Sequence, residues 1–310
     1  MENFSKDFFT WDFWYHFDSN AKKFKVFFLN APISLKQNEQ HHFSSKIGYA
    51  ETADFENFGN INYNVFEAEP SSWDNSSIWS GDVIASNDKL LFFYTSRDKN
   101  LDDGMTQNIG LAVSDNGGLS WERRGLKLEP CEDYFLTKAL PTEKTTHSWR
   151  DPFLFNSDGK AMMLVSAKSK EGVDNYRGAI ALLMASKGRL DNFETAVPFL
   201  DPGLFGEMEV PQIFVDENGA GLVAFSCLKE HDHFLEKGGF YAIRLPRNNF
   251  SKPSKPELIL SQDSGIYAAR VIPELGGEII GFDFKNGGIK KSGQKVLWQH
   301  PKRNFDGFSF

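Results

Sequence analysis

The sequence has few cysteines, no long apolar run and no excess of basic residues. Two cysteines, Cys131 and Cys227, occur in 310 residues without a Cys-x-x-Cys spacing or a neighbouring histidine cluster, which indicates reduced thiols rather than a disulfide framework or a metal site. No apolar segment approaches the roughly 18 residues that span a bilayer. The N-terminus lacks the basic start and apolar run of a signal peptide. We therefore predict a cytoplasmic protein that does not bind membranes.

The charge balance excludes another class of partner. Asp and Glu number 42 against 34 Lys and Arg, which gives a net charge of −8 and argues against a nucleic-acid or anionic-membrane surface. Aromatic residues make up 15% of the chain, with 30 Phe and 7 Trp, so we expect an aromatic-rich core. A neutral, hydroxyl-rich ligand is compatible with this composition.

The sequence also lacks a helical apolar periodicity, and its proline and glycine residues recur too often for a helix bundle. Short apolar strands alternate instead with Gly- or Asp-bearing turns. Such strand-turn-strand units occupy residues 82–96, 153–167, 212–227 and 265–284. Meanders repeating every 40 to 60 residues or so predict an all-β chain, a five-bladed β-propeller of four-stranded sheets forming a single domain over residues 1–310. Blades are expected to begin near Phe8, Ser77, His147, Glu207 and Gly265. A two-sheet sandwich is the alternative.

Carboxylates flanked by aromatic residues or proline stand near four of the predicted blade starts. The four stretches are Trp11-Asp12-Phe13-Trp14, Trp79-Ser80-Gly81-Asp82, Trp149-Arg150-Asp151-Pro152 and Gly206-Glu207-Met208-Glu209-Val210-Pro211. The innermost strand of each propeller blade lines the central channel, so equivalent positions converge on one pocket. Carboxylates placed together repel, which raises the pKa of one while another stays ionised. Glycoside hydrolysis uses that division between a proton donor and a group that attacks or stabilises the sugar cation.

This ordered set of motifs resembles the sucrose-using β-fructosidases, namely the levansucrases of glycoside hydrolase family 68 and the invertases of family 32. Other stretches resemble strands and loops of the same family: 23–28, 47–55, 110–121 and 265–270. The resemblance spans nearly the whole chain. It implies cleavage of sucrose or a related β-fructoside with retention of configuration, or transfer of the fructosyl group. It implies no metal and no cofactor.

The resemblance also implies a role for each site residue. Asp12 resembles the nucleophile that forms a covalent fructosyl-enzyme, Asp151 the transition-state stabiliser, and Glu209 the general acid/base. Sugar-binding roles are implied for Trp11, Trp79, Ser80, Arg150 and Glu207.

Departures from the family pattern concern the substrate more than the reaction. Phe13 follows Asp12 where an invertase has proline, which favours the levansucrase-like side, and Gln212 stands where invertases usually carry an acid. The chain stops soon after the last predicted blade, so we expect no appended β-sandwich. Shorter loops predict a shallow, open leaving-group subsite.

Each assignment has a structural alternative. Asp12 could be a turn residue at a strand end, and Arg150 with Asp151 could be a buried ion pair without a catalytic role. Residues two apart on a strand share one face, so Glu207 could replace Glu209 as the acid.

The aromatic and polar neighbours of the motifs have alternatives too. Trp14 is the tryptophan most readily explained as core. His41 and His42 could contact sugar, but their charged surroundings favour solvent exposure. The Asp-rich stretch 98–104 resembles a calcium loop only loosely and indicates a solvated loop.

Two functional alternatives remain from the sequence. Arabinan-active propeller enzymes also use two aspartates and a glutamate, but they invert configuration. A propeller that binds sugar without turning it over would use the same carboxylates as hydrogen-bond acceptors.

Overall fold

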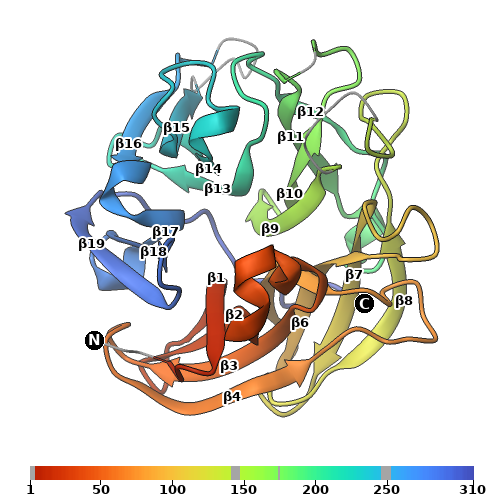
Figure 1. Cartoon of the computed structure of the whole chain (residues 1–310), viewed down its shortest axis with the longest axis vertical. Helices are drawn as coiled ribbons and strands as arrows, with labels where there is room; N and C mark the ends of the chain where they lie inside the picture. Colours follow the sequence, from red (N-terminus) through yellow and green to blue (C-terminus); the bar gives the residue numbers. More distant parts are fainter. Residues whose placement is uncertain (1–3, 141–146, 174, 246–252) are drawn as a thin grey trace.

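The computed structural model describes residues 4–140, 147–173, 175–245 and 253–310. Five antiparallel sheets are arranged around a central axis, and consecutive sheets in the chain are neighbours in space (Figure 1). Each sheet is a meander whose first strand lies nearest the axis. The predicted all-β, five-bladed propeller is therefore confirmed.

The blades follow one another without interruption. Blade 1 contains β1 (Phe8–Asp18), β2 (Lys23–Pro32), β3 (Lys46–Thr52) and β4 (Phe58–Phe66). Blade 2 contains β5 (Ile78–Ser86), β6 (Lys89–Arg97), β7 (Gln107–Ser114) and β8 (Glu122–Leu128). Blade 3 contains β9 (Trp149–Ser157), β10 (Lys160–Lys168), β11 (Gly178–Met184) and β12 (Val197–Leu200). Blade 4 contains β13 (Glu209–Val215), β14 (Gly221–Cys227), β15 (Gly239–Leu245) and β16 (Glu257–Ser261), and blade 5 contains β17 (Ile266–Ile272), β18 (Glu278–Asp283) and β19 (Ile289–Lys295).

Blade 5 departs from the prediction of four-stranded sheets, because its sheet has three strands in the described part of the chain. The segment after β19 leaves the blade and crosses blades 4, 3 and 2 in turn. Gln299 pairs with Val215 of blade 4, and the Lys302 carbonyl accepts a hydrogen bond from the backbone N–H of Asn156 in blade 3. The Phe305 carbonyl accepts a hydrogen bond from the Ser86 hydroxyl of blade 2. This C-terminal segment, residues 296–310, therefore ties four blades together in place of a fourth strand.

Blades 1 and 5 close the ring through hydrogen bonds from the β18–β19 turn and from β17 to β1. The backbone N–H of Gly288 donates to the Thr10 carbonyl (2.9 Å), and Arg270 Nε donates to the Phe13 carbonyl (2.5 Å). The Trp14 side chain is fully buried and stacks on Phe92 of blade 2, with ring centroids 5.4 Å apart. Trp14 is thus a core residue between two blades, as the sequence indicated.

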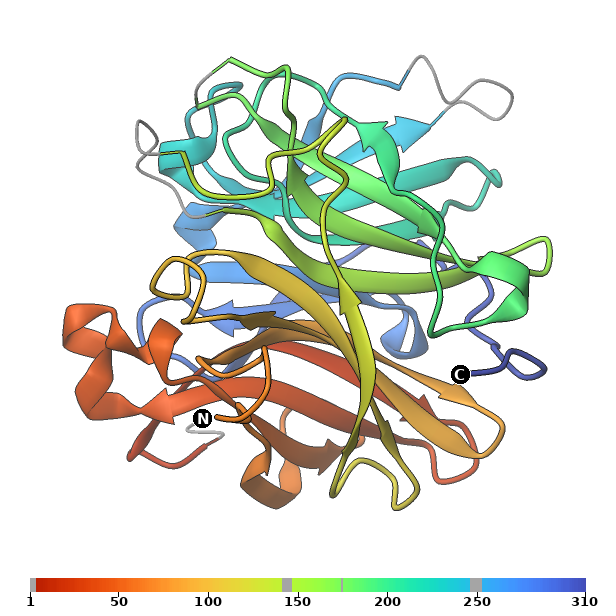
Figure 2. The same ribbon diagram turned by 90° about the vertical axis from the view of Figure 1, so that its right-hand side faces the viewer.

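The two faces of the propeller differ. The 3₁₀ helices after β2, η1 (Ile33–Asn38) and η2 (Gln40–Phe43), project from one face, and the C-terminus lies at the opposite face (Figure 2). The remaining 3₁₀ helices are η3 (Ser186–Gly188), η4 (Lys229–His231), η5 (Gln262–Ser264) and η6 (Pro273–Leu275). No helix in the described residues is long and apolar enough to cross a membrane.

Candidate active site

A bulge near the start of every inner strand builds the site. In each blade the register between the first and second strands shifts at the same place. The extra residues are Asp12, Ser80, Asp151-Pro152, Val210-Pro211 and Ala268-Ala269. Three of them adopt positive φ angles: Asp151 at 57°, Val210 at 50° and Ala268 at 46°. Bulges re-aim side chains, and strained backbone of this kind is typical of functional sites.

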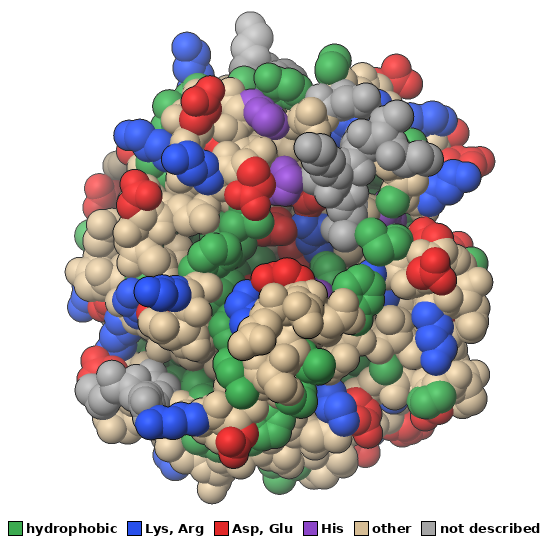
Figure 3. Space-filling view, viewed as in Figure 1, with side chains coloured by type: hydrophobic (Ala, Val, Ile, Leu, Met, Phe, Trp, Pro, Cys, Tyr) green, Lys and Arg blue, Asp and Glu red, His purple; other side chains and the backbone are tan. Residues whose placement is uncertain are grey.

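The bulges open into a cavity of about 520 Å³ at the centre of the face that carries η1 and η2. Figure 3 shows this hollow, with apolar walls and acidic and histidine side chains beside it. All eight residues that the sequence predicted for the site line the cavity: Trp11, Asp12, Trp79, Ser80, Arg150, Asp151, Glu207 and Glu209. The structure therefore brings together residues from blades 1 to 4.

Asp151 is fixed at both carboxylate oxygens. The Ser80 hydroxyl donates to Oδ1, and the backbone N–H of Val210 donates to Oδ2 at 3.0 Å. The Asp151 backbone N–H in turn donates to Thr95 Oγ1 at 3.0 Å. Groups of blades 2 and 4 thus hold this blade 3 carboxylate in one orientation, as a group that must bind sugar hydroxyls requires.

Arg150 neutralises the acidic cluster from inside. The guanidinium is buried; Nη2 contacts both Glu207 and Glu209, the latter at 2.8 Å, and Nε lies 3.6 Å from Asp151 Oδ2. A buried cation with several carboxylates is held by charge-assisted hydrogen bonds, which fix its geometry. Arg150 is therefore positioned chiefly by acidic groups of blades 3 and 4.

Glu207 and Glu209 occupy different electrostatic environments. Burial acts to raise the pKa of Glu207, but the charges of Arg150 and Lys168 outweigh it and bring that pKa down to about 2. Ser148 also donates to its carboxylate, at 2.7 Å. Burial raises the pKa of Glu209; Glu207 and Asp151 add to this effect, and Arg150 only partly offsets it. Glu209 is the carboxyl suited to carry a proton, whereas Glu207 stays ionised and anchors Arg150.

Tyr267 is a site residue to which the sequence gave no role. Tyr267 directly precedes the blade 5 bulge. The residues at the equivalent position of blades 1 to 4 are Trp11, Trp79, Arg150 and Glu209. The Tyr267 hydroxyl donates to Glu209 Oε2. The signal was present, because Tyr267 belongs to the stretch that resembles the family's last blade. The tyrosine hydroxyl carries no charge, so the sequence alone gave no reason to pair Tyr267 with a carboxylate.

Asp12 is buried beside two other carboxylates of the cavity. Burial raises its pKa to about 8, with the charges of Asp151 and Glu209 acting in the same direction and that of Arg270 opposing them. When Glu209 is protonated, one of these negative charges is removed, and the pKa of Asp12 falls.

The expectation that His41 and His42 are solvated is wrong for His41, which is only 1% exposed. Both rings pack edge-on against Trp11, at centroid distances of 4.9 and 5.9 Å, and both line the cavity. Burial lowers the pKa of His41 to about 3 and that of His42 to about 4. These imidazoles are neutral parts of the cavity wall.

One group of side chains in the described residues has the chemistry to hold a cation. The ligand atoms of Glu39, His41 and His42 lie within 4.8 Å of one another on the rim of the cavity. The sequence predicted no metal site. Glu39 is largely exposed and also lies 3.5 Å from Lys36.

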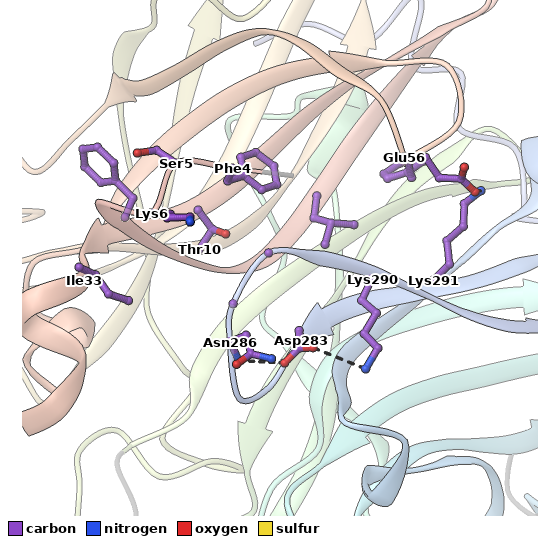
Figure 4. Close-up of a pocket in the computed structure, with 15 residues that line it drawn as sticks. Phe4, Ser5, Lys6, Thr10, Ile33, Glu56, Asp283, Asn286, Lys290 and Lys291 are labelled. Atoms are coloured by element: carbon purple, nitrogen blue, oxygen red, sulfur yellow. Dashed lines mark hydrogen bonds and ion pairs between the residues drawn. The ribbon is translucent and has the colours of Figure 1, made fainter. Parts of the chain in front are cut away.

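A second cavity, of about 780 Å³, lies where the start of the chain meets the turn between β18 and β19 (Figure 4). Its basic residues include Lys290, 3.5 Å from Asp283, and Lys291, 2.6 Å from Glu56. None of the predicted site residues lines it. Its polar groups do not form the carboxylate cluster that glycoside chemistry needs.

Comparison with known families identifies the family of this chain. Residues 14–272 match the profile described as the glycosyl hydrolases family 32 N-terminal domain. The chain belongs to glycosyl hydrolase family 32. The family-32 match includes Asp151 and Glu209 and begins two residues after Asp12, so the place of Asp12 in the site rests on its position in the blade 1 bulge.

A sequence relative of this family-32 chain is the sucrose-6-phosphate hydrolase of Bacillus subtilis. The two are 31% identical over 204 residues, which cover 61% of this chain and 37% of the relative. The matched region thus spans little more than a third of that protein's length.

Solved structures show how widely this fold is shared. The inulosucrase of Halalkalicoccus jeotgali bound to kestose has a TM-score of 0.65 and 18% identity, with 90% of this chain and 77% of that chain covered. The endo-arabinase of Bacteroides thetaiotaomicron has a TM-score of 0.65 and 15% identity, with 94% and 95% covered. At these identities the likeness shows the propeller fold alone.

Proposed function

We propose that this family-32 chain is a β-fructofuranosidase that hydrolyses sucrose or a related β-fructoside with retention of configuration. The observation that carries the proposal is the convergence of Asp12, Asp151 and Glu209 from three blades on one cavity. Family membership supports glycoside hydrolysis. The name of the Bacillus subtilis relative supports a sucrose-like substrate.

In the first step Glu209 donates its proton to the glycosidic oxygen as that bond breaks, and an Asp12 oxygen bonds to the anomeric carbon of the fructosyl group. Asp151 accepts hydrogen bonds from the furanose hydroxyls as positive charge develops. In the second step Glu209 takes a proton from water, whose oxygen displaces Asp12. A retaining mechanism requires the two reacting carboxyls about 5 to 5.5 Å apart.

The charges of the site support this division of roles. Glu209 has a raised pKa and accepts a hydrogen bond from Tyr267, which orients the carboxyl. Its protonation removes one of the charges that raise the pKa of Asp12. The state with a neutral Glu209 and an ionised Asp12 is the one that the first step needs.

Replacement of Asp12 by Asn, followed by an assay of fructose release from sucrose, tests the proposal. We expect kcat to fall roughly 10³- to 10⁵-fold, because no other group takes the nucleophile's place. Asp18→Asn is the matched control, since Asp18 ends the same strand outside the cavity and uses Oδ1 to accept hydrogen bonds from a turn. Unchanged activity in Asp12→Asn would remove Asp12 from the mechanism.

A sugar hydroxyl that replaces water in the second step would make the chain a fructosyltransferase. The open cavity mouth favours this, because the exposed Glu39 and half-exposed His42 leave the rim accessible to an acceptor. Incubation with a high concentration of sucrose, followed by chromatography, distinguishes kestose-type products from free fructose.

A further inference from the structure

Arg97 is a buried cation on the wall of the active-site cavity, and the proposed mechanism does not use it. It ends β6, whose partner β5 carries Trp79 and Ser80. The side chain is 1% exposed, yet it belongs to the same cavity lining as Asp12 and Asp151. It therefore stands beside the site rather than at the protein surface.

The contacts of Arg97 hold the guanidinium in place without neutralising it. Nε donates to the Gly104 carbonyl, and Nη2 lies 3.4 Å from the Met105 sulfur. The guanidinium carbon lies 4.2 Å from the ring centroid of Phe43 and 5.0 Å from that of Trp79. Among the described residues, no carboxylate forms an ion pair with Arg97, in contrast to Arg150.

A buried charge without a counter-ion is unfavourable. Burial lowers the pKa of Arg97 to about 10, and the more distant Asp102 offsets this only in part. The guanidinium is nevertheless protonated at neutral pH. An anionic group that enters the cavity would supply the missing counter-charge, and the aromatic rings would keep the guanidinium oriented toward it.

A second cation lies near Arg97. Burial lowers the pKa of His42, the charge of Glu39 opposes this effect, and the charges of Lys36 and Arg97 add to it, so both cations act on one imidazole. The Trp79 indole donates to the His42 carbonyl at 2.8 Å, which joins η2 to this wall. Phe43 of η2 is 40% exposed, and its ring lies over the Arg97 guanidinium.

We propose that Arg97 binds a phosphate ester carried by the substrate, which makes a phosphorylated β-fructoside the preferred substrate class. This inference rests on the proposed function. A guanidinium presents paired N–H donors that match the oxygens of a phosphate. The phosphorylated substrate in the name of the Bacillus subtilis relative is of the same class.

Calorimetric titration of the full chain tests the inference independently of turnover. The probes are fructose 6-phosphate and glucose 6-phosphate, each compared with its unphosphorylated sugar, for wild type, Arg97→Gln and Arg97→Lys. A charge-assisted hydrogen bond predicts that at least one phosphorylated sugar binds roughly 10- to 100-fold more tightly than its parent. This ratio should approach one in Arg97→Gln and be partly retained in Arg97→Lys. Arg189→Gln, half-exposed and outside the cavity lining, is the matched control and should keep the wild-type ratio.

The sugar whose affinity is increased by its phosphate is the one whose ring faces Arg97. If neither phosphate strengthens binding to wild type, or if Arg97→Gln keeps the full gain, the inference is overturned. If the wild type releases fructose from sucrose but its affinity is not increased by a phosphate on either sugar, only the role of Arg97 is contradicted. A phosphate gain that depends on Arg97, together with no cleavage of any β-fructoside, would support that role and contradict the proposed hydrolysis.

Discussion

Replacement of Arg150 by Met should destabilise the fold strongly and in a pH-dependent manner. Arg150 is buried, contacts the carboxylates of Glu207 and Glu209, and lies 3.6 Å from that of Asp151. Interactions in the folded state bring the pKa of Glu207 from 4.5 to about 2. Since one pKa unit corresponds to about 1.4 kcal/mol, this shift contributes about 3 kcal/mol at neutral pH. Loss of one partner of a buried ion pair costs a comparable 3 to 5 kcal/mol or so.

The sign of the pH dependence follows from the lowered pKa of Glu207. Its contribution is fully present above pH 4.5, where the carboxyl is ionised in both the folded and unfolded states, and it is lost as the pH falls toward 2. By pH 3 less than about half of it remains. The difference in stability between wild type and Arg150→Met should therefore shrink between pH 7 and pH 3.

Urea unfolding at pH 7, 5 and 3 measures this difference. Arg189→Met is the matched control, because Arg189 forms an exposed pair with Asp191 and its loss should change stability by no more than about 0.5 kcal/mol. A loss below about 1 kcal/mol for Arg150→Met at pH 7, or a loss that does not vary with pH, would refute the electrostatic account of the site.

Three further variants test separate parts of the structure. In Tyr267→Phe the loss of a hydrogen bond that lowers the pKa of Glu209 should move the high-pH limb of kcat/KM upward by roughly one unit; an unmoved limb would separate Tyr267 from the acid. Asp151→Asn should lower kcat roughly 10²- to 10⁴-fold with a change in Tm of only a few degrees, because Asn tolerates the left-handed φ at this position. If Asp151 had a purely structural role, Tm would fall strongly and kcat would change little. Phe305→Ala should lower the free energy of unfolding by about 3 to 5 kcal/mol, since the ring is fully buried in the C-terminal segment, and chemical denaturation measures this.

The blades could be predicted from the sequence because their signals are local. A turn such as 156–159 joins two apolar strands that pair in the structure as the sequence indicated. The C-terminal segment could not be predicted in the same way. Its partners, including Val215 and Ser86, lie far away in the chain, and an extended segment without alternation does not specify them.

The site was predictable to the extent that charged residues mark it. The spacing of Glu207 and Glu209 left open which is the acid, because the spacing does not show which carboxylate faces Lys168 on the neighbouring strand β10. His41 is buried because its ring packs against Trp11. The charged residues next to His41 in the sequence gave no sign of this contact. Long-range packing, rather than residue type, decides both.

The measurement that tests the central claim most directly is the course of sucrose cleavage followed by NMR. If Asp12 forms a covalent intermediate and Glu209 activates water, the first fructose released is the β-furanose, and its mutarotation follows later. Initial appearance of the α-anomer would show inversion and contradict the assigned roles. Absence of cleavage of sucrose, its phosphate and other β-fructosides would contradict the proposed function itself.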